Sequence, residues 1–203
     1  MVALVFAKWH VVKQLYGTSA ARGTVLNRTA RDFFALCQHA FVSDILMSAG
    51  RLLDPPSTGG KSNLSLARLA DAVAECGAQD LATSLNAVLS ETREREASAR
   101  EHRNRRLAHN DLATVLNAGS NPLPPVTVSD IDELLTLLAN FLNAIDYHYC
   151  ENTTFFDSPI QNGDGDTLAG WLRDGVRFRE QEMNRKRTLA GLPEVPSSLP
   201  PEA

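Results

Sequence analysis

The chain has 203 residues, of which 43% are hydrophobic and 22% charged, a composition typical of one ordinary globular domain. Its formal net charge of −4 excludes a global attraction to nucleic acid or to an anionic membrane, so such binding would depend on local patches. Three widely spaced cysteines without a C-x-x-C pair indicate neither a disulfide framework nor a zinc site, and we expect buried, small hydrophobic side chains.

The start of the chain, M-V-A-L-V-F-A-K-W-H, has too short an apolar run for a signal peptide and carries no basic leader. From the apolar pattern we expect no segment with the length of a transmembrane helix. These features predict a soluble cytoplasmic protein that makes no membrane contact.

Apolar residues recur at helical spacing along most of the chain. They predict helices over residues 3–16, 24–53, 64–76, 80–106, 131–149 and 166–186. The fourth is either one long helix or two helices joined by a kink. Ser129 with Asp132 is the expected cap of the fifth helix, and Asp166 or Thr167 that of the last.

No strand alternation or internal repeat is visible, and residues 55–63 and 118–126 are rich in loop-forming residues. We therefore predict an all-α bundle of about five or six helices. Residues 1–150 form the helical domain, and residues 151–203 form a connector, a C-terminal helix and a disordered Pro-rich tail.

The most unusual stretch is Glu101–Asp111, written E-H-R-N-R-R-L-A-H-N-D. From Arg93 to Glu101, arginines alternate with glutamates, and we favour a solvated helix face with i,i+3 and i,i+4 ion pairs. After Glu101 no acid follows until Asp111, so the local charge is positive and a solvated face explains it less well.

Arg103, Asn104 and His109 match the motif of the HEPN superfamily, in which an Arg is followed by a polar residue and, several residues later, by a His. The flanking features resemble the AbiU-like, abortive-infection branch of that superfamily. They are Trp9, R-L-L-D-P at 51–55, N-L-S-L at 63–66 and A-H-N-D at 108–111. The resemblance covers roughly the region up to residue 150. It implies a helical HEPN-like homodimer, with the site formed by two copies that face each other.

The resemblance implies a metal-independent endoribonuclease in phage defence or a toxin–antitoxin system, with RNA as substrate and an antitoxin protein as a possible partner. His109 would act as general acid/base, Arg103 as phosphate clamp, and Asn104 would orient the histidine or hold the backbone. The expected substrate-binding residues are Arg105, Arg106 and Asn110. We expect neither a metal nor a cofactor.

Helical geometry leaves the choice of arginine open. On an ideal helix Arg103 and His109 point about 120° apart, whereas Arg105 and Arg106 lie close to the face of His109. Arg103 is thus the assignment by resemblance, and Arg105 or Arg106 the assignment by geometry. A bend in the helix or a site shared by two copies would relax the requirement.

Two other interpretations stay open. The chain could be a non-catalytic RNA- or protein-binding dimer module that uses the same basic patch, or these polar residues could simply fix a helix end or a dimer contact. The basic residues of the last helix could widen a phosphate-binding surface. We favour a solvated helix there, because acids dilute that charge at Asp174, Glu180 and Glu182.

Overall fold

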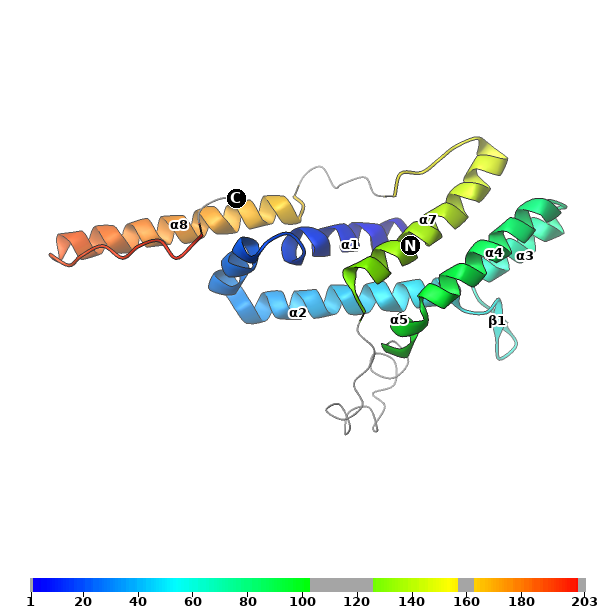
Figure 1. The fold of residues 1–203 in the computed structure, drawn as a ribbon, viewed down its shortest axis with the longest axis horizontal. Coiled ribbons are helices and arrows are strands. Elements are labelled where there is room, and N and C mark those ends of the chain that lie inside the picture. The colour runs from blue at the N-terminus through cyan, green and yellow to red at the C-terminus, as the bar shows by residue number, and fades with distance from the viewer. Residues whose placement is uncertain (1, 103–125, 157–162, 201–203) are drawn as a thin grey trace. The chain divides into compact units, whose positions relative to one another are not determined.

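The computed structural model describes residues 2–102, 126–156 and 163–200 (Figure 1). Within these residues the protein has six helices of ten residues or more, one short helix and one small hairpin. The helices are α1 Val2–Tyr16, α2 Ala20–Leu53, α3 Leu66–Glu75, α4 Gln79–Arg95, α5 Ala97–His102, α7 Val128–Cys150 and α8 Gly165–Leu189. The all-α prediction is confirmed.

The described residues belong to two compact units. The first, here the α3–α4–α7 unit, contains the described parts of Met1–Val5 and Ser43–Phe156. The second, here the α1–α8 unit, contains those of Phe6–Val42 and Asp157–Ala203. The division at residue 150 that we predict from the sequence stays a prediction.

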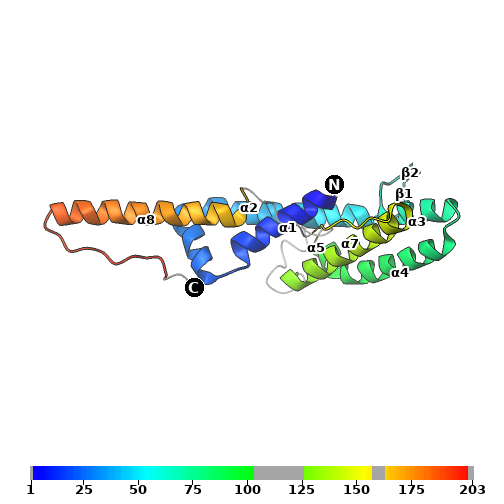
Figure 2. The same cartoon turned by 90° about the horizontal axis from the view of Figure 1, so that it is seen from above.

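In the α3–α4–α7 unit, α4 packs against both α3 and α7 (Figures 1 and 2). Each of the three helices buries apolar residues three or four positions apart, the spacing of one helix face. In α7 these residues are Ile131, Leu134, Leu135, Leu138 and Phe141. Complete burial of each large side chain contributes about 1.5–3 kcal/mol, so this face sets the position of α7.

The N-terminal cap of α7 lies two residues before the predicted one. The Thr127 hydroxyl accepts a hydrogen bond from the Asp130 backbone N–H at 3.2 Å, and the Asp130 carboxylate accepts one from the Thr127 backbone N–H at 2.7 Å. This reciprocal pair is a capping box. The prediction of Ser129 with Asp132 is wrong because T-x-x-D and S-x-x-D overlap here and sequence spacing fits both.

A two-residue hairpin, β1 Ser57–Thr58 and β2 Lys61–Ser62, lies within the predicted loop 55–63. Its turn residues Gly59 and Gly60 have φ of 57° and 77°, which a two-residue hairpin turn requires and glycine adopts most readily. The prediction of an all-loop segment therefore misses a small strand pair.

The α1–α8 unit has a small core formed by Leu15, Leu26, Phe34 and Ala169. Gln14 joins α1 to the start of α8: its Nε2 donates to Asp164 Oδ2 at 2.7 Å, and its Oε1 accepts from the Gly165 N–H at 2.9 Å. A Cβ on Gly165 would lie 3.0 Å from the Gln14 side chain, so glycine permits this close approach.

Asp164, rather than the predicted Asp166 or Thr167, caps α8. Its carboxylate accepts a hydrogen bond from the Thr167 backbone N–H at 2.9 Å. That bond, together with those from the Gln14 and Thr167 side chains, lowers the pKa of Asp164 to about 2. Asp166 contacts Arg22 and accepts a hydrogen bond from Gln14 Nε2 at 2.9 Å. The prediction fails here because N-G-D-G-D offers two aspartates, and the sequence alone does not show which of them precedes the first helical turn.

The helix α2 begins earlier than predicted and is kinked at Ala30, whose φ of −162° and ψ of 71° are not helical. The preceding residue, Thr29, donates its hydroxyl to the Val25 carbonyl oxygen at 2.8 Å. Such bonds to the carbonyl four residues back are associated with helix bending, which fits a kink at this position.

By length and composition α2 could cross a membrane. The expectation that no segment reaches that length therefore does not hold for α2. The core helix of a soluble protein meets the same two criteria, and one such helix is weak evidence for a membrane span.

Residues 193–200, part of the tail predicted to be disordered, make hydrogen bonds to α8. Asn184 Nδ2 donates to the Val195 carbonyl at 2.8 Å, and the Val195 N–H donates back to Asn184 Oδ1 at 2.9 Å. Ser197 Oγ donates to Glu180 Oε2 at 2.8 Å. The composition predicts disorder because the tail has few apolar residues to bury, but composition does not show which polar side chains of α8 bond to the tail.

The cysteines are not all buried. Cys37 is partly buried, whereas Cys76 and Cys150, near the ends of α3 and α7, are exposed. The prediction of buried side chains is therefore wrong for Cys76 and Cys150. Apolar composition does not distinguish a core position from a helix end.

Candidate functional site

The six predicted site residues lie outside the described residues. They are Arg103, Asn104, Arg105, Arg106, His109 and Asn110, between the described ranges 2–102 and 126–156. Their assignment stays a prediction. The structure does describe the segment that leads into them, the end of α4 and the whole of α5.

The predicted helix 80–106 is two helices over its described part. The helix α4 ends at Arg95, α5 begins at Ala97, and Glu96 caps the first with its backbone N–H bonded to the Thr92 carbonyl at 2.9 Å. Of the two alternatives that the sequence leaves open, a kinked pair of helices is confirmed.

An ion pair holds the joint between α4 and α5. The Glu96 side chain is 2% exposed, and Arg100 donates to its Oε2 from Nε at 2.9 Å and from Nη2 at 2.7 Å. A buried carboxylate is costly unless it is paired and hydrogen-bonded. Arg100 therefore fixes the first turn of α5 three residues before Arg103.

A hollow of about 400 Å³ lies beside this ion pair. The end of α2 and the residues after it, including Leu53, Asp54 and Pro55, form one side, and Arg93, Glu96 and Arg100 form the other. Arg93 Nη2 lies 3.5 Å from the Leu53 carbonyl oxygen, to which it donates a long hydrogen bond. Two guanidinium groups and two carboxylates line the hollow, so its charges are balanced.

The arginines before the motif have structural contacts, and most of these differ from the predicted ones. Only Arg100 with Glu96 forms an i,i+4 pair among the described residues of this stretch. Arg93 reaches α2, and Arg95 pairs with Glu133 of α7 at 3.1 Å. Both arginines thus link α4 to neighbouring helices, and a pattern of local spacing does not reveal such links.

Three of the four flanking features that carry the family resemblance lie in the described residues. Trp9 is buried, and Leu52 and Leu53 of R-L-L-D-P are buried at the end of α2. In N-L-S-L, Asn63 Nδ2 donates to the Pro55 carbonyl at 2.8 Å, and Ser65 caps α3. The contacts described for these features are packing and capping contacts.

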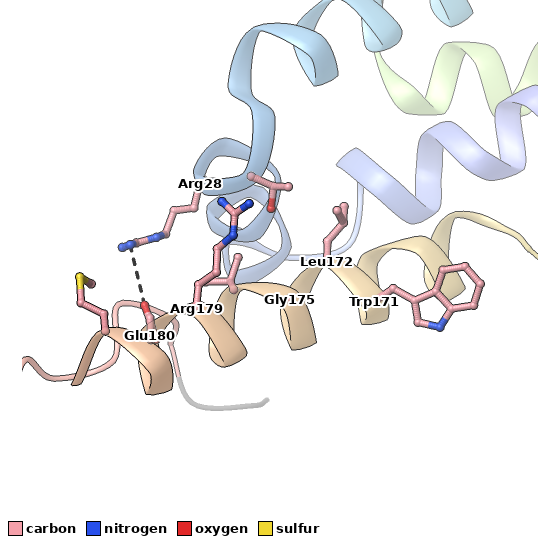
Figure 3. Close-up of a pocket in the computed structure, with 9 residues that line it drawn as sticks. Arg28, Trp171, Leu172, Gly175, Arg179 and Glu180 are labelled. Atoms are coloured by element: carbon pink, nitrogen blue, oxygen red, sulfur yellow. Dashed lines mark ion pairs between the residues drawn. The ribbon is translucent and has the colours of Figure 1, made fainter. Parts of the chain in front are cut away.

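A second candidate site, which the sequence analysis did not identify, is a groove of about 480 Å³ in the α1–α8 unit (Figure 3). One side comes from Arg28 and Thr29 of α2, and the other from α8. The α8 residues are Trp171, Leu172, Gly175, Val176, Arg179, Glu180 and Met183. Helical spacing places Trp171 away from the buried Ala169 and Val176, a signal that would have predicted its exposure.

A comparison with protein families identifies the chain. The family model described as AbiU2, of HEPN type, matches residues 3–167, more than half of the sequence. The chain belongs to the AbiU2 family of HEPN proteins. No curated protein and no solved structure matches the sequence.

The AbiU2 match extends from α1 to the first residues of α8 and spans the predicted motif residues Arg103, Asn104 and His109. It confirms the superfamily and the branch indicated by the short motifs. Most of α8 and the segment bonded to it lie beyond the matched residues.

Proposed function

We propose that this AbiU2-family protein is a metal-independent endoribonuclease of a phage-defence or toxin–antitoxin system. One observation carries the proposal: the family match spans a stretch with the Arg–polar–spacer–His pattern, Arg103, Asn104 and His109. We further propose that the protein acts in the cytoplasm as a homodimer, with an antitoxin protein as a possible partner.

The proposed chemistry needs no metal. His109 accepts the proton of a ribose 2′-hydroxyl, the 2′ oxygen attacks the adjacent phosphorus, and the bond from phosphorus to the 5′ oxygen breaks. The proton that His109 has taken up then passes to the leaving 5′ oxygen, directly or through water, and completes the step. The products are a 2′,3′-cyclic phosphate and a 5′-hydroxyl. Arg103 stabilises the charge that develops on the phosphoryl oxygens.

The described frame supports this assignment of roles. Arg93, Arg95 and Arg100 are engaged with α2, α7 and Glu96, so they hold helices together. Within the stretch from Arg93 to Arg106, the candidates for phosphate binding are therefore Arg103, Arg105 and Arg106. The ion pair between Glu96 and Arg100 anchors the chain just before that residue.

Cleavage of single-stranded RNA in EDTA by the wild type and by His109→Ala tests the proposal. We expect the substitution to lower the rate by about 10²–10⁴-fold, the range for loss of a general acid/base, while helical circular dichroism is unchanged. Equal rates in the two proteins would contradict the role of His109.

The alternative is a non-catalytic RNA- or protein-binding dimer module. The stretch between Glu101 and Asp111 is compatible with it, because this stretch contains arginines and no acid and could hold phosphates without acid/base chemistry. Under this alternative the wild type retains RNA without cutting it, and retention weakens as salt rises.

A further inference from the structure

The groove between α2 and α8 has an arginine on each side and an exposed aromatic ring on the α8 side (Figure 3). Arg28 and Arg179 both line it. Trp171 is 71% exposed, and its ring is the aromatic group among the residues that line the groove.

The single carboxylate in the groove neutralises its arginines poorly. Glu180 accepts hydrogen bonds from the Ser197 and Ser198 hydroxyls and from the Ser198 N–H at 3.1 Å. It also forms an ion pair with Arg28, whose Nη2 lies 3.8 Å from Glu180 Oε1, too far for a hydrogen bond (Figure 3). Among the described residues no ion pair involves Arg179. Two arginines thus share one carboxylate, which leaves guanidinium donors for an anion.

The surrounding helix has the same charge bias. Between Trp171 and Arg187, α8 carries six basic and three acidic side chains, although the whole chain is acidic. Trp171 lies eight residues, about 12 Å along the helix axis, from Arg179. A base stacked on Trp171 and a phosphate held by Arg179 would thus belong to different nucleotides of one strand.

We propose that this groove binds single-stranded RNA, with Arg28 and Arg179 on a phosphate and Trp171 stacked on a base. A cationic groove with an aromatic platform is the common arrangement for single-stranded nucleic acid, and each stacked base contributes about 1–3 kcal/mol. The choice of RNA rests on the proposed function. The groove extends RNA binding to residues beyond the family match.

Tryptophan fluorescence tests the groove directly because the chain has two tryptophans. Trp9 is 5% exposed, so a base can quench only Trp171 by stacking. The measurement uses His109→Ala protein, which is not expected to cut the probe, and a single-stranded RNA of about 12 nucleotides. We expect saturable quenching in this protein and none in its Trp171→Phe derivative.

Arginine substitutions in the same His109→Ala protein separate the groove from diffuse attraction. Arg179→Ala should weaken binding roughly tenfold and lower the salt slope by about 0.7, the value for one phosphate contact. The matched control is Arg185→Ala, which removes the same charge from α8 at a side chain 73% exposed and paired with Glu182. It should leave affinity and slope unchanged.

The outcomes separate this inference from the proposed nuclease. If the wild type cleaves RNA but RNA does not quench Trp171 in the His109→Ala protein, RNA binding in the groove is contradicted and the proposed nuclease is not. Quenching with no cleavage by the wild type would support the groove and contradict the nuclease. Equal effects of Arg179→Ala and Arg185→Ala would contradict RNA binding in the groove. Quenching that appears when the protein concentration is raised without RNA would also contradict it, because Trp171 would then lie in a contact between protein chains.

Discussion

At the scale of single residues, the caps of α7 and α8 show how the polar side chains act. Thr127 and Asp130 satisfy each other's backbone N–H groups at the start of α7. At the start of α8, Asp164 accepts from the Thr167 N–H and Gln14 accepts from the Gly165 N–H. The backbone N–H groups in the first turn of a helix have no acceptor within the helix. A capping side chain therefore supplies the hydrogen bond that water would otherwise provide.

Loss of the α7 cap gives a stability prediction. Thr127→Ala should lower the free energy of unfolding by about 1 kcal/mol, because the Asp130 N–H loses its acceptor. Ser129→Ala is the matched control, since Ser129 is exposed and its hydroxyl donates a hydrogen bond to Glu133 Oε1 at 3.2 Å. It should change stability by less than about 0.5 kcal/mol. Urea unfolding measures both, and a larger effect at Ser129 would contradict the observed cap.

Asp164 gives a prediction for pH. Its pKa in the folded protein is about 2, chiefly because the Thr167 N–H and the Gln14 side chain donate to the carboxylate. The folded pKa lies below the ordinary value of about 3.9, so the stabilisation is present above pH 4 and is lost as pH falls toward 2.

Denaturant midpoints between about pH 5 and 2, read by circular dichroism, measure this loss. The Asp164→Asn variant keeps a capping oxygen that does not titrate, so its midpoint should fall less over that range. Parallel curves for the wild type and the variant would show that Asp164 does not carry the acid sensitivity.

At the scale of elements, hydrophobic spacing predicted the helices well and their joints poorly. The inward residues of α7, such as Leu134 and Phe141, are three or four apart, and that spacing is visible in any sequence. The kink at Ala30 and the bonds from Gln14 to Asp164 and Gly165 involve partners that no local pattern reveals.

At the site, too, contacts within one helix could be predicted from the sequence and contacts between helices could not. The i,i+4 spacing of Glu96 and Arg100 made their pair predictable, whereas the contacts of Arg93 with Leu53 and of Arg95 with Glu133 depend on how helices meet. The motif from Arg103 to His109 came from the resemblance, and its geometry lies outside the described residues. The exposed ring of Trp171 follows from helical spacing, but Arg28 of α2 on the other side of the groove does not.

The joint between α4 and α5 carries an element-scale prediction. Arg100→Ala should destabilise the protein by about 1–3 kcal/mol, because the buried Glu96 carboxylate loses two donated hydrogen bonds. Arg95→Ala removes an equal charge from an exposed pair and should cost less than about 1 kcal/mol. Thermal and urea unfolding compare the two, and equal costs would contradict the anchoring role of Arg100.

At the scale of the whole molecule, the family resemblance implies that two copies face each other to form the site. The dimer is a proposal, and it has a kinetic consequence. If both copies contribute groups to one site, activity per chain must fall when dilution dissociates the dimer.

Sedimentation velocity and RNA cleavage, measured over the same protein concentrations, test this consequence. We expect the rate per chain to follow the dimer fraction. Full activity per chain in a sample that sediments as a monomer would show that one copy holds a complete site.

The central claim is RNA cleavage through the 2′-hydroxyl with His109 as acid/base. Analysis of the product ends by mass spectrometry, after cleavage of single-stranded RNA in EDTA, tests it most directly. The account predicts 2′,3′-cyclic phosphate and 5′-hydroxyl ends from the wild type, formed at least about a hundredfold more slowly by His109→Ala. Ends with 3′-hydroxyl and 5′-phosphate groups, or cyclic phosphates formed equally by the variant, would contradict it.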